Sequence, residues 1–234
     1  TALWTIKGNS DDRFDKYIVV SFSNATIVLS IGDTVEEVTT TGFLLTARTL
    51  AVALLDDNTI LQVHPGGVRH IKAGNKVVEW KTPGQRPVSR AIVNSRQAVL
   101  AVDKAAKGGG LATELIYFEL DAAGQLSEES SLELDTDITD LDMGEAPAGR
   151  TTFPFCAIGQ VDDTVTVLSL DRSDLLQHRA VMQLTARPDS LKFVDLSDTA
   201  GGTGDGALSL NIGLQSGVLV RVAVDSVSGR WRRL

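Results

Sequence analysis

Pairs of apolar runs separated by short polar turns recur along the chain. The segments YIVVSFSNATIVLSI (17–31), VALLDDNTILQV (52–63) and AIGQVDDTVTVLSL (157–170) share this form. Their runs are rich in Val, Ile, Thr and Phe, which are typical of pleated strands. Their tips hold Asn, Asp and Ser, which tolerate the backbone angles of tight turns. The pattern therefore predicts a series of antiparallel β-hairpins.

The hairpins form a repeat when each is aligned on the residue that starts its second run. The aligned positions are Thr26, Thr59, Glu114, Thr164 and Val218. Their mean spacing of about 48 residues is close to the length of a four-stranded propeller blade. Several runs are nearly continuous in apolar residues, as expected for strands covered on both faces. We therefore predict an all-β fold, a β-propeller of WD40-like four-stranded blades, with about five of seven blades present and residues 1–234 forming a single incomplete propeller.

Segments between the hairpins differ in length and composition. We expect a Gly-rich loop at 103–114 and a flexible insert at 195–207. The acidic segment 127–145 keeps apolar residues at strand spacing, and this pattern predicts an edge strand with a charged outer face that blunts edge pairing. Segment 173–184 could form a helical turn, but its place between two repeats favours an outer strand.

Composition narrows the class of protein. The chain has 234 residues, 43% of them apolar, and a net charge of −8. This balance argues for a globular chain and against a broad, sequence-independent grip on nucleic acid, which needs a basic surface. One cysteine, Cys156, excludes an intrachain disulfide and fits a reducing compartment. No run approaches the roughly 18 apolar residues of a membrane span, so we expect no membrane partner.

The ends of the sequence suggest that it belongs to a longer protein. It opens without Met and stops at RWRRL, inside what looks like a continuing strand pattern. The start, TALWTIKGNSDDRFD, is polar and mixed in charge, unlike a signal peptide. We therefore expect a piece of a longer protein, and either the propeller is truncated or its remaining blades lie outside this sequence.

Three candidate ligand sites do not match the chemistry they would need. His64, His70 and His178 are too scattered for a zinc site, which wants several Cys or His at close, paired spacings. GGTGDG at 201–206 is followed by a strand pattern, whereas a dinucleotide loop must open a helix. DTDITDLD at 135–142 lacks the central Gly and terminal Glu of a calcium loop. We interpret these segments as ordinary histidines, a loop and a solvated strand face.

Two further motifs have structural alternatives. Asn24-Ala25-Thr26 is a glycosylation sequon, but a hairpin tip favours the same residue types. SGRWRRL at 228–234 joins basic and aromatic residues, as RNA-binding segments do; we favour a packed Trp231 with solvated arginines and expect no direct RNA contact. No Ser-His-Asp or Cys-His pair stands out, so we assign no catalytic, cofactor-binding or metal residue. The tips at 56–58 and 162–163 are interpreted as structural, and the partner-binding residues stay unknown.

Long strings of the sequence resemble a known family. YIVVSFSNATIVLSIG (17–32), VVEWKTPGQRPVSRAIVNSRQAVLAV (77–102) and LSLNIGLQSGVLVRVAVDSVSG (208–229) resemble the middle propeller of the splicing factor 3B subunit 3 family, in order and over nearly the whole chain. That family shares a superfamily with the large subunit of the damaged-DNA-binding complex and the largest subunit of the cleavage and polyadenylation specificity factor. EWKTP (79–83) is common to the superfamily, whereas NATIVLSIG and LNIGLQSGVLVR point to the splicing branch.

The resemblance implies a function that composition and spacing do not. It implies the second of three seven-bladed propellers, in a non-enzymatic, nuclear scaffold of splicing factor 3b in the U2 small nuclear ribonucleoprotein, which supports branch-site recognition. Implied partners, through the parent protein, are the HEAT-repeat large subunit and small subunits of splicing factor 3b, and a histone-acetylating coactivator complex. The alternative is a cullin-type ubiquitin ligase adaptor like the damaged-DNA-binding relative. An enzyme with its site in a propeller channel would need convergent polar residues on inner strands, and these strands are apolar.

Overall fold

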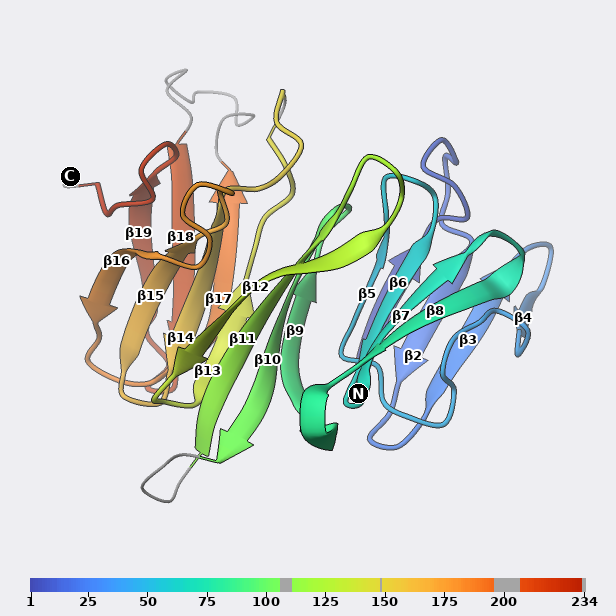
Figure 1. The fold of residues 1–234 in the computed structure, drawn as a ribbon, viewed down its shortest axis with the longest axis horizontal. Coiled ribbons are helices and arrows are strands. Elements are labelled where there is room, and N and C mark those ends of the chain that lie inside the picture. The colour runs from blue at the N-terminus through green and yellow to red at the C-terminus, as the bar shows by residue number, and fades with distance from the viewer. Residues whose placement is uncertain (106–110, 148, 196–206, 233–234) are drawn as a thin grey trace. The chain divides into compact units, whose positions relative to one another are not determined.

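The fold was analysed in a computed structural model that describes residues 1–105, 111–147, 149–195 and 207–232. These residues form five antiparallel sheets, four of them four-stranded and one three-stranded (Figure 1). In each sheet the strands are neighbours in the order in which they follow along the chain. This up-and-down order is that of propeller blades, and the predicted all-β fold class is confirmed.

The first two sheets come from the N-terminal 81 residues. The first sheet comprises β1 (Ala2–Ile6), β2 (Tyr17–Ser21), β3 (Thr26–Ile31) and β4 (Val35–Glu37). The second comprises β5 (Ala51–Leu54), β6 (Ile60–His64), β7 (Gly67–Lys72) and β8 (Lys76–Lys81). Two single turns of 3-10 helix flank β8, η1 (Ala73–Asn75) and η2 (Pro83–Gln85).

The other three sheets follow without interleaving. The third comprises β9 (Val88–Val93), β10 (Gln97–Ala105), β11 (Leu111–Leu120) and β12 (Leu126–Leu134). The fourth comprises β13 (Ile138–Asp142), β14 (Phe155–Gln160), β15 (Thr164–Ser169) and β16 (His178–Gln183). The fifth comprises β17 (Pro188–Asp195), β18 (Ala207–Leu214) and β19 (Leu219–Asp225).

The chain divides into two compact units. The first contains residues 1–103 and 116–129, and the second contains residues 104–115 and 130–234. The long strands β10, β11 and β12 contribute to both units. Across the described residues, no helix is long and apolar enough to cross a membrane.

The repeat holds, but one of its five alignment points belongs to a different strand. Thr26 and Thr164 start the third strands of their sheets, and Val218 directly precedes another third strand, β19. Thr59 instead precedes β6, the second strand of its sheet. The third strand there is β7, which follows β6 after the two-residue turn Pro65-Gly66. The sequence repeat was irregular because a second-strand hairpin carries the same apolar runs and polar tip as a third-strand hairpin.

The acidic segment 127–145 is not one strand, contrary to the sequence prediction. Its first part is β12, the edge strand of the third sheet, as expected for a charged outer strand. Its second part is β13, which starts the fourth sheet and pairs with β14. Segment 173–184 contains β16, the edge strand of the fourth sheet, so the prediction of an outer strand is confirmed.

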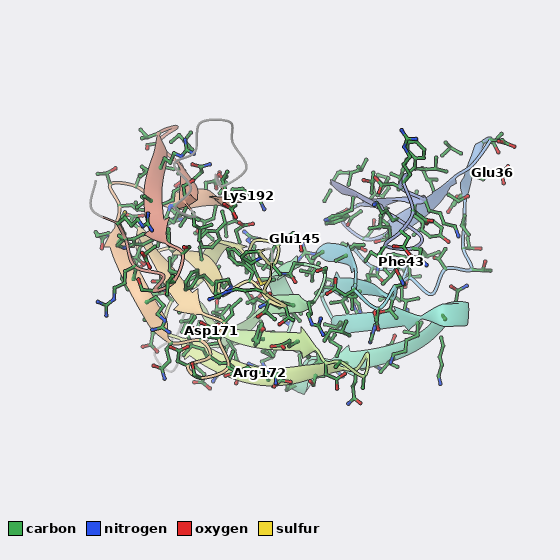
Figure 2. All side chains as sticks on the ribbon, turned by 90° about the horizontal axis from the view of Figure 1, so that it is seen from above. Glu36, Phe43, Glu145, Asp171, Arg172 and Lys192 are labelled. Carbon is green, nitrogen blue, oxygen red and sulfur yellow. The ribbon has the colours of Figure 1, made fainter. Side chains whose placement is uncertain are left out.

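The first unit has two apolar clusters, one for each pair of adjacent sheets. The cluster between the first and second sheets comprises Ile6, Val19, Val28, Phe43, Val52 and Ile71. Phe43 lies in the connection from β4 to β5, and its side chain is buried, whereas Glu36 is exposed on the short outer strand β4 (Figure 2). The cluster between the second and third sheets includes Leu61, Val68, Leu100, Ile116 and Phe118, all at most 2% exposed.

In the second unit, β14 and β15 are buried on both faces. Residues 155–159 and 165–169 are all buried, without the alternation of a half-solvated strand. The prediction that strands with nearly continuous apolar runs are buried on both faces is therefore confirmed for β14 and β15. Phe153 makes edge-to-face contacts with Phe155 and Phe193, at ring-centroid distances of 6.4 Å and 5.3 Å.

Hairpin tips adopt left-handed backbone angles at non-glycine residues. Asn58 has φ +62° in the turn between β5 and β6, and Asp163 has φ +64° in the turn between β14 and β15. Asn and Asp tolerate this region better than other L-residues because their short side chains bond to the local backbone. Both tips are therefore the tight turns that the sequence predicted.

Asp163→Pro is expected to destabilise the second unit, since the proline ring fixes φ near −65° and the native value is +64°. The expected loss exceeds about 1 kcal/mol of unfolding free energy, a fall of more than about 2 °C in melting temperature for a chain of this size. Thermal melting followed by far-UV circular dichroism measures it. Asp163→Gly is the matched control and should melt close to the parent; equal melting of the proline variant would place the turn elsewhere.

Gly67→Ala should be strongly destabilising, because Gly67 begins β7 with φ +143° and a Cβ there would lie 2.1 Å from the Trp80 carbonyl oxygen on β8. We expect a loss of about 1–3 kcal/mol in urea denaturation. Its neighbour Gly66 offers the control, since a Cβ there would meet only His64 side-chain atoms, the nearest at 3.2 Å. Equal effects of the two alanine variants would contradict the close approach of β7 and β8.

Candidate functional site

His70 belongs to a partly buried chain of polar groups that fixes a hairpin tip. Its Nε2 lies 2.6 Å from Thr59 Oγ1, which lies 2.5 Å from Asp57 Oδ1. The single hydroxyl proton of Thr59 goes to the Asp57 carboxylate, so we assign the Nε2 of His70 as a donor to Thr59. Burial, with a smaller effect of Lys72, lowers the pKa of His70, and the imidazole is therefore neutral at pH 7. The role of this histidine is structural.

The remaining histidines and the cysteine do not combine into a site. His64 Nδ1 accepts a hydrogen bond from Gly66 N at 3.1 Å, which shapes the turn into β7. His178 is exposed at the start of β16. Cys156 is fully buried, and this burial raises the pKa of its thiol far above the ordinary range. No group of three or more His, Cys, Asp and Glu that could hold a metal ion occurs among the residues that the structure describes.

The acidic segment 135–142 joins the fourth and fifth sheets. The prediction that this segment is a solvated strand face is wrong for Asp142, which is buried. Asp140 Oδ2 accepts a hydrogen bond from Leu191 N at 2.7 Å, and Asp142 Oδ2 accepts one from Phe193 N at 2.7 Å. Asp140 and Asp142 are two residues apart on β13, and Leu191 and Phe193 are two apart on β17, so each pair lies on one side of its strand. Asp142 is 3% exposed. β13 and β17 belong to different sheets and, within the described residues, are not paired by backbone hydrogen bonds. The two aspartates connect them through side-chain to backbone hydrogen bonds instead.

Charge balance at this joint depends on one lysine. Lys192, labelled on β17 in Figure 2, donates from Nζ to Asp142 Oδ1 at 2.9 Å. Burial nevertheless raises the pKa of Asp142 above its ordinary value, because the loss of hydration outweighs the hydrogen bonds from Phe193 and Lys192. The joint therefore holds a carboxylate that is costly to ionise but bonded on both oxygens.

A neutral polar joint connects the first and second sheets. Gln62 is fully buried; its Oε1 accepts from Leu44 N and its Nε2 donates to Thr49 Oγ1, both at 2.8 Å. Thr49 Oγ1 lies 2.8 Å from Thr26 Oγ1. Thr26 is the third residue of the sequon, so this hydroxyl has a structural role, while Asn24 is exposed at the hairpin tip.

The basic C-terminal segment contacts the fifth sheet through an isolated bridge. Trp231 forms an isolated antiparallel bridge to Val224 of β19, and its indole Nε1 donates to Val181 O at 3.2 Å. Arg232 pairs with Asp225, whose pKa is held at about 2 mainly by hydrogen bonds from Ser228. Trp231 is thus half-buried at an isolated bridge outside the named strands, which favours the structural interpretation of this residue. The sequence candidate GGTGDG at 201–206 lies outside the described residues.

The first unit carries a groove along the outer strands of its second and third sheets. We call this the β8–β12 groove; it is bounded by Val78 and Trp80 of β8 and by Leu126 and Glu128 of β12, with Phe118 of β11 also lining it. It has a volume of about 340 Å³. Pockets of this size that mix apolar walls with a few polar groups are the usual places for ligands. It is the candidate site of this chain.

Aromatic packing fixes the walls of the groove. The rings of Trp80 and Phe118 meet edge to face, with centroids 5.0 Å apart and planes at 80°. Lys72 of β7 also lines the groove, and its Nζ donates at 2.9 Å to the carbonyl oxygen of Gly124 in the β11–β12 turn. The two sheets are thus held together on one side by apolar contact and on the other by a hydrogen bond.

Sequence reasoning missed the groove. Among its residues it considered His70 for a metal and rejected it, quoted Glu79 and Trp80 only within EWKTP, and covered Glu128 only within the acidic segment 127–145. The groove needs β8 and β12, whose residues Trp80 and Leu126 are far apart in sequence. The signal in the sequence was the pair Val78 and Trp80, two apolar residues two apart and therefore on one face of a strand.

Comparisons with known proteins identify the family. The model described as "RSE1/DDB1/CPSF1 second beta-propeller" matches residues 1–232. The chain belongs to this RSE1/DDB1/CPSF1 family. Its five sheets are therefore blades of a partial β-propeller, and the resemblance inferred from the sequence is confirmed.

Curated relatives come from plants, animals and fungi. The chain is 47% identical to Spliceosome-associated protein 130 A of Arabidopsis thaliana over 98% of its own length. It is 46% identical to Splicing factor 3B subunit 3 of Danio rerio over 97% of its length, and 45% identical to Pre-mRNA-splicing factor rse1 of Emericella nidulans over 98%. The matched region is 18–19% of each relative, so the chain spans about a fifth of their length.

Asp142→Ala should loosen the joint between the fourth and fifth blades. It leaves the buried Phe193 amide without its 2.7 Å acceptor and Lys192 without its ion pair. We expect a loss of about 1–3 kcal/mol in urea denaturation, the cost of an unsatisfied buried donor. Asp135→Ala is the control, because Asp135 belongs to the same acidic segment and is exposed. A loss no larger than in the control would show that the carboxylate does not hold the blades.

The same carboxylate predicts a pH dependence. The pKa of Asp142 is raised above 3.8 by burial, so its linked stability is complete below pH 3.8 and is lost as pH rises through the folded-state pKa. The unfolding free energy of the parent minus that of Asp142→Asn should therefore fall as pH rises from about 3.8 and then level off. Urea denaturation of both chains across this range measures it. A difference that grows with pH would contradict the sign.

Proposed function

We propose that this chain is a blade-bearing part of a non-enzymatic scaffold subunit that acts in pre-mRNA splicing, as a component of splicing factor 3b in the U2 small nuclear ribonucleoprotein. Residues 1–234 contribute to a single propeller whose other blades lie elsewhere in the parent chain, the second of three. The scaffold works in the nucleus and supports branch-site recognition.

The observation that carries this proposal is the agreement among the relatives. Proteins 45–47% identical to nearly the whole chain bear the names spliceosome-associated protein, splicing factor 3B subunit and pre-mRNA-splicing factor. The family description also includes DDB1 and CPSF1, yet the relatives with these identities carry splicing names. This favours the splicing branch over the cullin-type ubiquitin ligase adaptor.

Rigid sheets suit a scaffold. Adjacent blades are fixed by buried apolar clusters and by polar joints such as Gln62 with Thr49, so loops and outer strands are presented on a firm frame. Preorganised surfaces bind partners without a large ordering cost. Through the parent protein we propose the HEAT-repeat large subunit and small subunits of splicing factor 3b as partners, and a histone-acetylating coactivator complex as a second assembly.

Affinity capture of the full-length parent protein from nuclear extract, followed by mass spectrometry, tests the proposal. We expect the HEAT-repeat subunit and other U2 components to be recovered, and to be lost when the same capture is made from extract depleted of U2 particles. Recovery of a cullin with substrate receptors in their place would assign the chain to the ubiquitin ligase branch, with the propeller fold unchanged.

A further inference from the structure

The β8–β12 groove is bordered by two strands that have no hydrogen-bonded neighbour on their outer side among the residues that the structure describes. β8 ends the strand order of the second sheet, and β12 ends that of the third (Figure 1). An edge strand presents unpaired backbone amides and carbonyls, to which an extended peptide can add as a further strand. A segment that pairs with either edge carries alternate side chains toward the groove.

Uncompensated charge in the groove is negative. Lys72 uses its ammonium group on the Gly124 carbonyl oxygen, and Glu79 pairs with Arg69 at 3.3 Å. The Glu128 carboxylate is exposed and has no hydrogen bond or ion pair within the described part of the chain. The chain as a whole carries a charge of −8. Complementary charge on an occupant is therefore positive.

The apolar and aromatic side chains that line the groove favour a guanidinium group over an ammonium group. Val78 is 50% exposed, and with half-buried Leu126 it offers apolar surface to an alkyl stem. The half-buried Trp80 ring has exposed aromatic surface on which a planar cation can stack. A guanidinium group is planar, stacks on aromatic rings and presents several donors to a carboxylate, whereas an ammonium group is a compact and strongly hydrated point charge. A volume of about 340 Å³ admits single side chains and excludes a helix with its side chains.

We propose that the β8–β12 groove binds an arginine side chain carried by an extended segment of a partner protein. The guanidinium lies against Trp80 and pairs with Glu128, and the stem covers Val78. This inference deepens the proposed scaffold function by naming the chemistry of a partner, and it rests on that function only in taking the groove to be a protein-binding surface.

Saturation-transfer NMR with short peptides tests the groove directly. The probe is the peptide Ac-Gly-Val-Arg-Val-Gly-NH2, and its citrulline analogue removes the charge while keeping the shape. We expect saturation to pass to the arginine methylene protons, and the dissociation constant to rise by about threefold to tenfold for the citrulline peptide, as one partly exposed ion pair with ring stacking implies. Equal binding of the two peptides, or tighter binding of the glutamate analogue, would overturn the proposal.

Two neighbouring residues give a matched pair of variants. Glu128→Gln should weaken binding of the arginine peptide by about threefold to tenfold, whereas Glu129→Gln should leave it unchanged, since successive strand residues point to opposite faces. Both residues are exposed, so both variants should fold, and circular dichroism checks this. An equal effect of the two changes would show that bulk charge, not the groove, attracts the peptide.

A third variant tests the apolar wall, with a control in the other unit. Val78→Lys should abolish the saturation signal, because it replaces the apolar wall and places a positive charge where the guanidinium would lie. Val181→Lys is the control, because Val181 is 55% exposed on β16, which ends the fourth sheet as β8 ends the second. Failure of all peptide binding would overturn the groove assignment, while recovery of U2 components by the parent protein would still support the splicing function.

Discussion

A sheet of four short strands with apolar faces cannot stand alone in water, and the need to cover those faces governs this chain. Central strands such as β10 and β14 are buried over residues 97–102 and 155–159, and their residues Leu100 and Ile158 are fully buried. A blade therefore becomes stable only beside another blade, because burial of apolar area is the main favourable term in folding. Sequential up-and-down sheets satisfy this need with short connections.

Apolar packing between two blades does not by itself fix how one blade is positioned against the next. Buried polar groups that bond across the joint fix this position. The Asp142 carboxylate reaches a backbone amide of the next sheet, and the Gln62 amide reaches the Leu44 amide in the connection that leads from the first sheet to the second. Arg96, in the turn between β9 and β10, links the third sheet to the second through its pair with Asp56 in the β5–β6 turn, while its Nε donates to Leu120 O within the third sheet at 3.3 Å. Buried donors and acceptors must be satisfied, so each joint admits one arrangement of its two blades. Apolar contact alone would tolerate sliding.

The sequence was sufficient for strands and hairpin tips because these depend on local pattern. Period, β-branched runs and Asn or Asp at turns identified the hairpins at Asn58 and Asp163, where the backbone is left-handed. It failed where the answer depended on tertiary neighbours. Thr59 looked equivalent to Thr26 because both precede an apolar run, and Asp142 looked solvated because its burial comes from β17. The groove was unpredictable for the same reason, since its walls come from two blades.

Inner and outer strands have different freedom to carry function. A residue such as Val167, fully buried between neighbours, is constrained by close packing, and a change of one methylene there is felt. An outer-strand residue such as Val78 or Glu128 is exposed, so its chemistry can be changed without disturbing the buried frame. The difference between buried and exposed positions also explains why the hairpin tips and the buried polar joints have structural roles in this chain. Specific recognition then falls to the outer strands, where edge amides and unpaired side chains occur together.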